Sequence, residues 1–215
     1  MSLDDRTSAT GTLPNDFQFS QSSLQDFLEC RRRFQLRYIL KYSWPALESE
    51  PLGENEKLRK LGIDFHLLAF QAFAGIPIEI LDKKVKSEPM ISWWDELKGL
   101  IKKNNLDKLE RFPEVQLMGK VGNYHLTATY DLVVRDSAGR FTIFDWKTSE
   151  RSPDRNLISQ KMQTRLYLYL LRNSGGVLND GNIISTDHIQ LVYWYAKPSI
   201  QPLRFPYSED QFQQD

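Results

Sequence analysis

The sequence predicts an α/β fold of the α+β kind, in which a central mixed sheet, built on a three-stranded antiparallel meander, is flanked by helices. Three patterns predict it. Apolar residues recur at helical spacing through the first half of the chain, the period switches to two over residues 115–147, and a helical stretch and one more strand follow. An additional helical region is therefore expected on the N-terminal side of the sheet.

The first half of the chain is expected to consist of a polar tail and three helices. Residues 1–15 are polar with little apolar content, which is typical of a loose tail. Helical spacing then begins, with Ser20 or Ser22 available as the N-cap. The expected elements are a first helix over 20–39, a loop over 44–53, a second helix over 54–73 closed by Gly75, and a third that carries Trp93, Leu97, Leu100 and Ile101.

The second half is expected to hold the sheet. Gly122-Asn123 and Ser137-Ala138-Gly139 are typical of hairpin turns between runs with a period of two. The expected elements are strands over 115–121, 124–135 and 140–147, a helix over 156–172, and a last strand over 188–196. Ser208-Glu209-Asp210 is a helix start that is followed by only five residues, so 208–215 is expected to be a frayed or truncated tail.

Composition excludes several classes of protein. The 215 residues include 28 Lys+Arg and 28 Asp+Glu, and 40% are hydrophobic, which is typical of one globular domain and not of a disordered or collagen-like chain. The lone Cys30 excludes an internal disulfide and a zinc or iron–sulfur site built from this chain's cysteines. Because no apolar run reaches the length of a membrane span and no signal peptide is apparent, a cytoplasmic protein that does not bind membranes is expected.

The strongest chemical pattern is an acid and a lysine at the end of an apolar strand. Asp145 and Lys147 are two residues apart, so on a strand they point to the same face. A three-residue loop at 137–139 would pair Asp136 with Arg140 and place Asp131 directly opposite Asp145. Facing carboxylates repel each other unless something compensates, and a Mg²⁺ or Mn²⁺ ion would do so.

Two alternatives remain open for these acids. Asp131 could pair with Lys147 or Arg135, which would leave Asp145 as an ordinary carboxylate at a strand end. A loop of even length would place Asp131 on the opposite face of the sheet and remove the facing pair.

Asp145-Trp146-Lys147-Thr148, preceded by Asp131, resembles the signature of the PD-(D/E)XK nuclease superfamily, and more closely its RecB-type nuclease domains and their CRISPR-associated iron–sulfur relatives. The resemblance runs from about Phe19 to Phe205. Further pieces match in order: Phe19–Leu24 with Cys30–Phe34, Gly62 with His66, Glu114, and Gln163 with Tyr167. The iron–sulfur relatives have three more cysteines near the C-terminus. Either this branch lacks the cluster or those cysteines lie beyond Asp215, so no iron–sulfur cluster is expected in this chain and Cys30 is expected to be free and buried.

The resemblance implies a restriction-endonuclease-like core and a metal-dependent DNA nuclease, an exonuclease by preference, in DNA repair, recombination or CRISPR-type processing. One domain would span 16–207, with a helical part over about 16–110 and the catalytic core over about 111–207. Its partners would be single- or double-stranded DNA ends and a helicase or recombination protein.

The resemblance also implies roles for individual residues. The implied roles are catalysis for Asp131, Asp145 and Lys147; Mg²⁺ or Mn²⁺ binding for His66, Asp131 and Asp145; substrate positioning for Gln163, Tyr167 and Glu114; and contacts with DNA phosphates for Arg31, Arg32 and Arg33. Each has a simpler alternative: a core histidine, a half-buried polar helix edge and a solvated basic face. An inactive nuclease-like module that binds DNA or serves as a scaffold is the alternative function.

Overall fold

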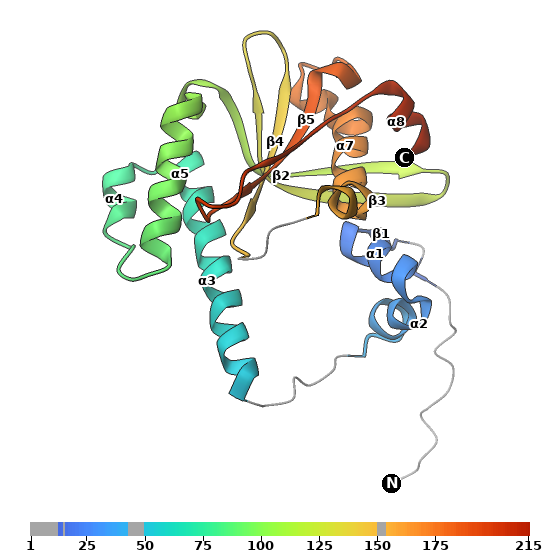
Figure 1. Ribbon diagram of the computed structural model, residues 1–215. Helices are drawn as coiled ribbons and strands as arrows, with labels where there is room; N and C mark the ends of the chain where they lie inside the picture. Colours follow the sequence, from blue (N-terminus) through green and yellow to red (C-terminus); the bar gives the residue numbers. More distant parts are fainter. Residues whose placement is uncertain (1–12, 15, 43–49, 150–153) are drawn as a thin grey trace.

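The computed structural model describes four stretches of the chain: residues 13–14, 16–42, 50–149 and 154–215. These stretches are coloured in Figure 1. Most of the expected N-terminal tail and residues 44–49 of the expected loop lie outside them, while residues 50–53 of that loop are helical.

The described strands form one mixed sheet. They are β1 (Gln18–Phe19), β2 (Glu110–Val121), β3 (Tyr124–Arg135), β4 (Phe141–Lys147), β5 (Ile189–Tyr195) and β6 (Leu203–Pro206). Their order is β1-β3-β4-β5-β6, and β2 also pairs with β3. β1 and β3 are parallel, as are β4 and β5, and the other pairs are antiparallel. The predicted meander is β2-β3-β4, and the predicted mixed sheet is confirmed.

The turn between β3 and β4 has the length that the sequence predicts. The Asp136 amide donates to the Arg140 carbonyl at 3.0 Å, and Gly139 lies in the left-handed region with φ 72°. A side chain would be strained there, so glycine suits the third loop position. The ladder that follows pairs Arg135 with Phe141 and Leu132 with Phe144. Continued by one residue, the same register would bring Asp131 opposite Asp145.

Helices cover both faces of the sheet (Figure 1). α3 (Glu50–Phe73) and α5 (Met90–Asn104) pack with Leu132, Phe144 and Trp146 in one hydrophobic cluster. α7 (Met162–Ser174) packs on the opposite face in a second cluster. None of the helices in the described stretches is long and apolar enough to cross a membrane.

Three helices, α4 (Ile78–Asp82), α6 (Arg155–Gln160) and α7, depart from the sequence pattern. α4 has five residues, too few to show a period. The helix expected over 156–172 is two helices, α6 and α7, with extended backbone at Lys161. The Thr164 hydroxyl donates to the Ile158 carbonyl at 2.6 Å, so a side chain satisfies an α6 carbonyl at this break.

The first predicted helix is likewise broken. α1 (Gln21–Glu29) begins after the Ser20 N-cap, and α2 (Arg31–Phe34) runs into a π-helical turn at Gln35–Ile39. Cys30 separates the two helices in an extended conformation, and it is exposed, so the expectation of a buried cysteine is wrong. Its sulfur accepts from the Arg33 amide at the start of α2, a capping role that holds it at the surface.

The last residues form a helix where the sequence predicts a frayed tail. α8 (Glu209–Gln214) begins after the Ser208 N-cap, as the sequence indicates. Arg165 of α7 donates to the Asp215 carboxylate at 2.7 Å and to the Gln214 carbonyl at 2.9 Å. These tertiary contacts stabilise a helix that is too short to be stable by itself.

Candidate active site

Three acids lie in one row across the meander. Glu114 lies between the pairs Pro113–Leu132 and Val115–Tyr130, which places it opposite Asp131. Continuing the β3–β4 ladder one residue beyond Leu132–Phe144 places Asp131 opposite Asp145. Glu114 has φ 48°, which is rare for a residue with a side chain. Loss of water around its carboxyl, and then the negative charge of Asp131, raise the pKa of Glu114.

The regular alternation of side chains changes at this row. Phe112 and Val115 of β2 pack against the same hydrophobic cluster, although they flank Glu114 at an odd spacing. Tyr130 and Val133 of β3 do the same on either side of Asp131. The left-handed backbone at Glu114 accounts for the change in β2 while the register stays constant. The prediction of facing carboxylates assumed that side chains alternate regularly between the two faces of the sheet. The pairing register agrees with the prediction, whereas the alternation of side chains does not.

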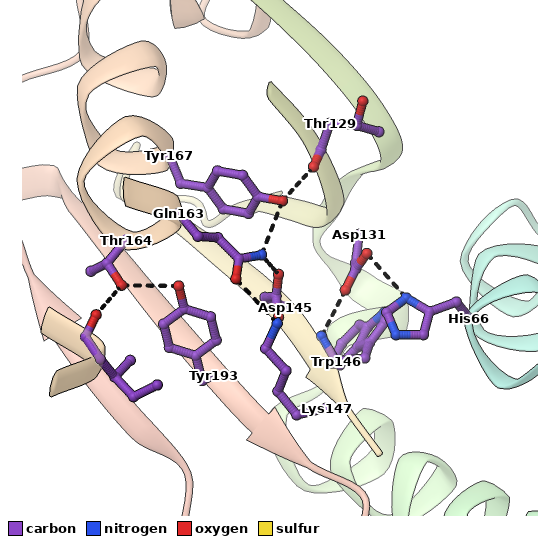
Figure 2. A network of polar contacts seen from close by, with 11 residues as sticks. His66, Thr129, Asp131, Asp145, Trp146, Lys147, Gln163, Thr164, Tyr167 and Tyr193 are labelled. Atoms are coloured by element: carbon purple, nitrogen blue, oxygen red, sulfur yellow. Dashed lines mark hydrogen bonds and ion pairs between the residues drawn. The ribbon is translucent and has the colours of Figure 1, made fainter. Parts of the chain in front are cut away.

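Asp131 is held by two neighbours (Figure 2). One carboxylate oxygen, Oδ1, is 3.2 Å from His66 Nδ1 of α3, and the other, Oδ2, accepts from the Trp146 amide at 2.7 Å. Burial opposes protonation of His66, but the hydrogen bond and the charge of Asp131 outweigh it, so its pKa is raised. The Asp131 carboxylate therefore connects His66 of α3 with Trp146 near the end of β4.

Asp145 is the most deeply buried charged group of the site, with 2% of its surface exposed. Its Oδ1 accepts from Gln163 Nε2 at 2.7 Å, and its Oδ2 is 2.6 Å from Lys147 Nζ. Burial, opposed by Lys147 and assisted by the charge of Asp131, raises the pKa of Asp145 to about 6. The contact with Lys147 is an ion pair, and within the described stretches no hydrogen bond of ordinary geometry reaches Oδ2.

Gln163 and Tyr167 share one side of α7 and face the acids (Figure 2). Gln163 Oε1 accepts from Lys147 Nζ at 3.2 Å, so this amide bridges Lys147 and Asp145. The Tyr167 hydroxyl donates to the Thr129 carbonyl of β3 at 2.7 Å. Both residues of the Gln-xxx-Tyr pair therefore contact the strands that carry the acids.

The arginines at the start of α2 differ from one another. Arg33 Nε lies 2.8 Å from Asp26, and the same guanidinium pairs with Glu29. Arg32 donates to Gln35 at 2.6 Å, and Arg31 stacks over the Phe27 ring. Arg31 and Arg32 are exposed, whereas Arg33 is committed to the α1–α2 corner.

The donor set fits a divalent cation by its chemistry. Two carboxylates and an imidazole are ligands that Mg²⁺ or Mn²⁺ accepts, and Asp145 Oδ2 is a buried oxygen without a hydrogen bond. Among the described residues, no three His, Cys, Asp or Glu side chains are already gathered as a metal-binding group. The hydrogen bonds of Asp131 to His66 and Trp146 keep its oxygens occupied.

Sequence reasoning missed three neighbours of this cluster. The Thr129 carbonyl and the side chains of Thr164 and Tyr193 complete the polar network of Figure 2. Tyr193 lies opposite Asp145 in the parallel β4–β5 pair. The sequence contains no turn that fixes the register of this pair, so no signal in it could have identified Tyr193.

Comparisons with known proteins agree on the family and the fold. The chain matches the model of the PD-(D/E)XK nuclease superfamily over residues 18–215. It is similar to the crystal structure of a candidate exonuclease from Eubacterium rectale, with 11% identity, a TM-score of 0.52, and coverage of 100% of this chain and 80% of that chain. This likeness confirms the predicted fold class and shows nothing more.

A second solved structure, that of SSO0001, is 18% identical with a TM-score of 0.43, and the match covers 94% of this chain and 73% of that one. That similarity is too low to support an argument. None of the curated proteins matches this sequence.

Proposed function

Because the chain belongs to the PD-(D/E)XK nuclease superfamily, we propose that it is a Mg²⁺- or Mn²⁺-dependent deoxyribonuclease, an exonuclease that acts on DNA ends. One observation supports this more than any other: the β3–β4 register, continued by one residue beyond Leu132–Phe144, sets Asp131 opposite Asp145, and His66 and Lys147 contact these acids directly. The family implies a nucleic-acid substrate, and DNA, the exonuclease mode and the metal are part of the proposal.

Each residue of the cluster has a proposed role. His66, Asp131 and Asp145 would hold the metal, which when bound neutralises charge on the scissile phosphate and lowers the pKa of a water ligand. Lys147 would stabilise negative charge that develops on the phosphate, since its ammonium lies beside the acids. Gln163 fixes the relative positions of Asp145 and Lys147. Glu114 and Tyr167 would position the substrate or the strands around it.

The proposal extends to the surface and to partners. Arg31 and Arg32 are exposed and suit contacts with DNA phosphates, which would make binding weaker at high salt. Arg33 contributes less in this proposal because two carboxylates already engage it. A role in repair, recombination or CRISPR-type processing, with a helicase or recombination protein as partner, completes the proposed setting.

The test is cleavage of end-labelled linear and circular DNA, single- and double-stranded, in Mg²⁺, Mn²⁺ or EDTA. We expect metal-dependent degradation of linear DNA and at least a hundredfold loss in Asp145→Asn and in Lys147→Ala, as is usual when a charge-stabilising group is removed. Asp107→Asn, an exposed carboxylate change outside the site, is the matched control.

Three outcomes separate the alternatives. Cleavage of circular DNA would replace the exonuclease mode with an endonuclease mode. DNA binding without cleavage under every metal would favour the inactive binding module. Cleavage that survives Asp145→Asn would remove the proposed site while leaving the family intact.

A further inference from the structure

Lys147 is held from three sides. Its Nζ is 2.6 Å from Asp145 Oδ2 and 3.2 Å from Gln163 Oε1. On the third side lies the ring of Tyr193, whose centroid is 5.2 Å from Nζ (Figure 2). An ammonium over the face of an aromatic ring is attracted by the ring's quadrupole, most strongly where water is excluded.

The ring of Tyr193 is placed by its strand. Tyr193 lies in β5 opposite Asp145 of β4, so its side chain and the carboxylate stand next to each other on the sheet. Tyr193 is 1% exposed, in the cluster that packs against α7. The side chain of Lys147 is 31% exposed. The ring is therefore a buried support beside the ammonium of a lysine whose side chain is partly exposed.

The hydroxyl of Tyr193 fixes the ring from its far end. The Thr164 hydroxyl is 3.0 Å from it and donates its own proton to the Ile158 carbonyl at 2.6 Å. A hydroxyl has one proton, so Tyr193 must donate and Thr164 must accept. Both side chains are buried, and losing this bond would leave a polar group unsatisfied.

If Asp145 binds a cation as proposed, its carboxylate interacts with two positive groups, the metal and the Lys147 ammonium. The carboxylate that pairs with Lys147 would then also be a metal ligand, whereas the contact with the Tyr193 ring is independent of that carboxylate. The ring can thus keep the ammonium in place through the reaction.

We infer that Tyr193 is a positioning residue for Lys147, anchored by Thr164. The inference rests on the proposed nuclease function for its catalytic meaning. The placement of the lysine can be tested without any cleavage assay.

The first measurement is the reactivity of Lys147 toward an amine-reactive N-hydroxysuccinimide ester, followed by mass spectrometry of the peptide that contains it. We expect modification several-fold faster in Tyr193→Leu than in the wild type, because the ammonium loses its support. Tyr193→Phe keeps the ring and is expected to stay closer to the wild type.

The second measurement is single-turnover cleavage of DNA. Tyr193→Leu is expected to lower the cleavage rate roughly 10- to 30-fold, the size of a desolvated cation–π contact. The concentration of DNA at half-maximal rate should change little, because Lys147 would act on charge that develops in the transition state. Tyr193→Phe should recover most of the loss.

Tyr207→Leu is the matched control. Tyr207 is buried in the same cluster, and its hydroxyl bonds to Asp215 rather than to the site. It should cost stability without changing the reactivity of Lys147 or the cleavage rate.

Equal Lys147 reactivity in the wild type, Tyr193→Leu and Tyr207→Leu would overturn the inference. So would equal losses of cleavage rate in Tyr193→Leu and Tyr207→Leu. A wild type that cleaves no DNA, with Lys147 reactivity changed as expected, would instead overturn the proposed function and leave the positioning contact standing.

Discussion

Asp145 combines the deepest burial in the site with a charge that its surroundings compensate only in part. Its Oδ1 accepts a hydrogen bond from Gln163, and among the described residues its Oδ2 has only the ion pair with Lys147. A buried carboxylate in this state costs the fold stability, and a cation would relieve that cost. This residue should therefore be more valuable to function than to folding.

The effect of Asp145 on stability has a definite sign. Its pKa is raised from the usual 3.8 to about 6 in the folded protein, so the folded state binds the proton more tightly than the unfolded state. Stability without metal should fall as the pH rises from about 4 to 6. Asp145→Asn lacks this loss and should be more stable above pH 6 by on the order of 2 kcal/mol.

Urea unfolding in EDTA at pH 4, 5.5 and 7.5 measures this difference. The gain of Asp145→Asn over the wild type should be small at pH 4 and largest at pH 7.5. Asp107→Asn provides the comparison for an exposed carboxylate. A gain that does not vary with pH would mean that ionisation of Asp145 is not its source.

The residues of the site were predictable to the extent that local rules place them. The length of the 137–139 loop fixes the register of β3 and β4, and the predicted register is observed from Arg135–Phe141 to Leu132–Phe144, one residue short of Asp131 and Asp145. The change of alternation at Glu114 was not predictable, because it depends on a backbone conformation that favours glycine and that only surrounding packing can impose. Tyr193 depends on a parallel pairing that no local rule fixes.

At the scale of elements, α3 and the end of β4 approach each other closely. A Cβ atom on Gly62 would lie 3.0 Å from Thr148 Oγ1, which is tighter than ordinary packing. Gly62 lies one helical turn before His66, so the closeness of this contact sets the position of the imidazole. Glycine at position 62 lowers the helix propensity of α3 but allows α3 to lie close to the end of β4.

Gly62→Ala should therefore lower activity more than stability. The added methyl group pushes α3 away from Thr148 by a few tenths of an ångström, while helix propensity improves by about 1 kcal/mol. We expect a several-fold loss of cleavage rate, partly restored by Thr148→Ala in the double variant. At Gly99 in α5 no described residue beyond its own helical turn lies within 4 Å of an added Cβ atom, so Gly99→Ala should gain stability and keep full activity.

Kinetics and thermal unfolding of these variants measure both effects. Equal activity in the wild type and Gly62→Ala would show that the α3–β4 distance does not control the site. No rescue by Thr148→Ala would show that the methyl group acts through another neighbour.

Element boundaries were less predictable than element types. The break at Cys30 is supported by Asp26 of α1, which pairs with Arg33 and Arg37 beyond the break. The break at Lys161 is supported by Thr164. In both places the helical spacing of apolar residues predicts one continuous helix, but side-chain contacts across the break stabilise two shorter ones. Such contacts form only in the folded chain, so the sequence pattern does not show them.

At the scale of the whole molecule, the site lies between two hydrophobic clusters on opposite faces of the sheet. His66 comes from α3, which packs in one cluster, and Gln163 comes from α7, which packs in the other. The overall layout, with helices around a mixed sheet, was predicted because the change of hydrophobic period is a property of long segments. The site is complete only when both helical layers are docked.

A metal held by His66 of α3 and by Asp131 and Asp145 of the sheet should stabilise the whole fold. At a metal concentration about 100 times its Kd, binding to the folded state alone adds about 2.7 kcal/mol. For a chain of this size that raises Tm by roughly 5–10 °C. Asp131→Asn and Asp145→Asn should lose most of this rise, and Asp107→Asn should keep it.

Thermal unfolding with increasing Mn²⁺ or Mg²⁺, against an EDTA reference, measures this effect in the absence of DNA. An equal rise of Tm in the wild type and in both site variants would place the metal elsewhere on the molecule.

The hydrogen bond from Tyr167 to the Thr129 carbonyl makes Tyr167 a part of the sheet as well as of the site. β3 pairs with β1 at residues 125–126 and with β4 at residues 132–135, and Thr129 lies between these stretches. Between these stretches the Tyr167 phenol donates to the Thr129 carbonyl the kind of hydrogen bond that a neighbouring strand would supply. A Tyr167→Phe variant would leave the Thr129 carbonyl without this donor. Its loss of activity would therefore have two sources: the loss of the hydroxyl from the site and a weakened hydrogen-bond pattern along β3.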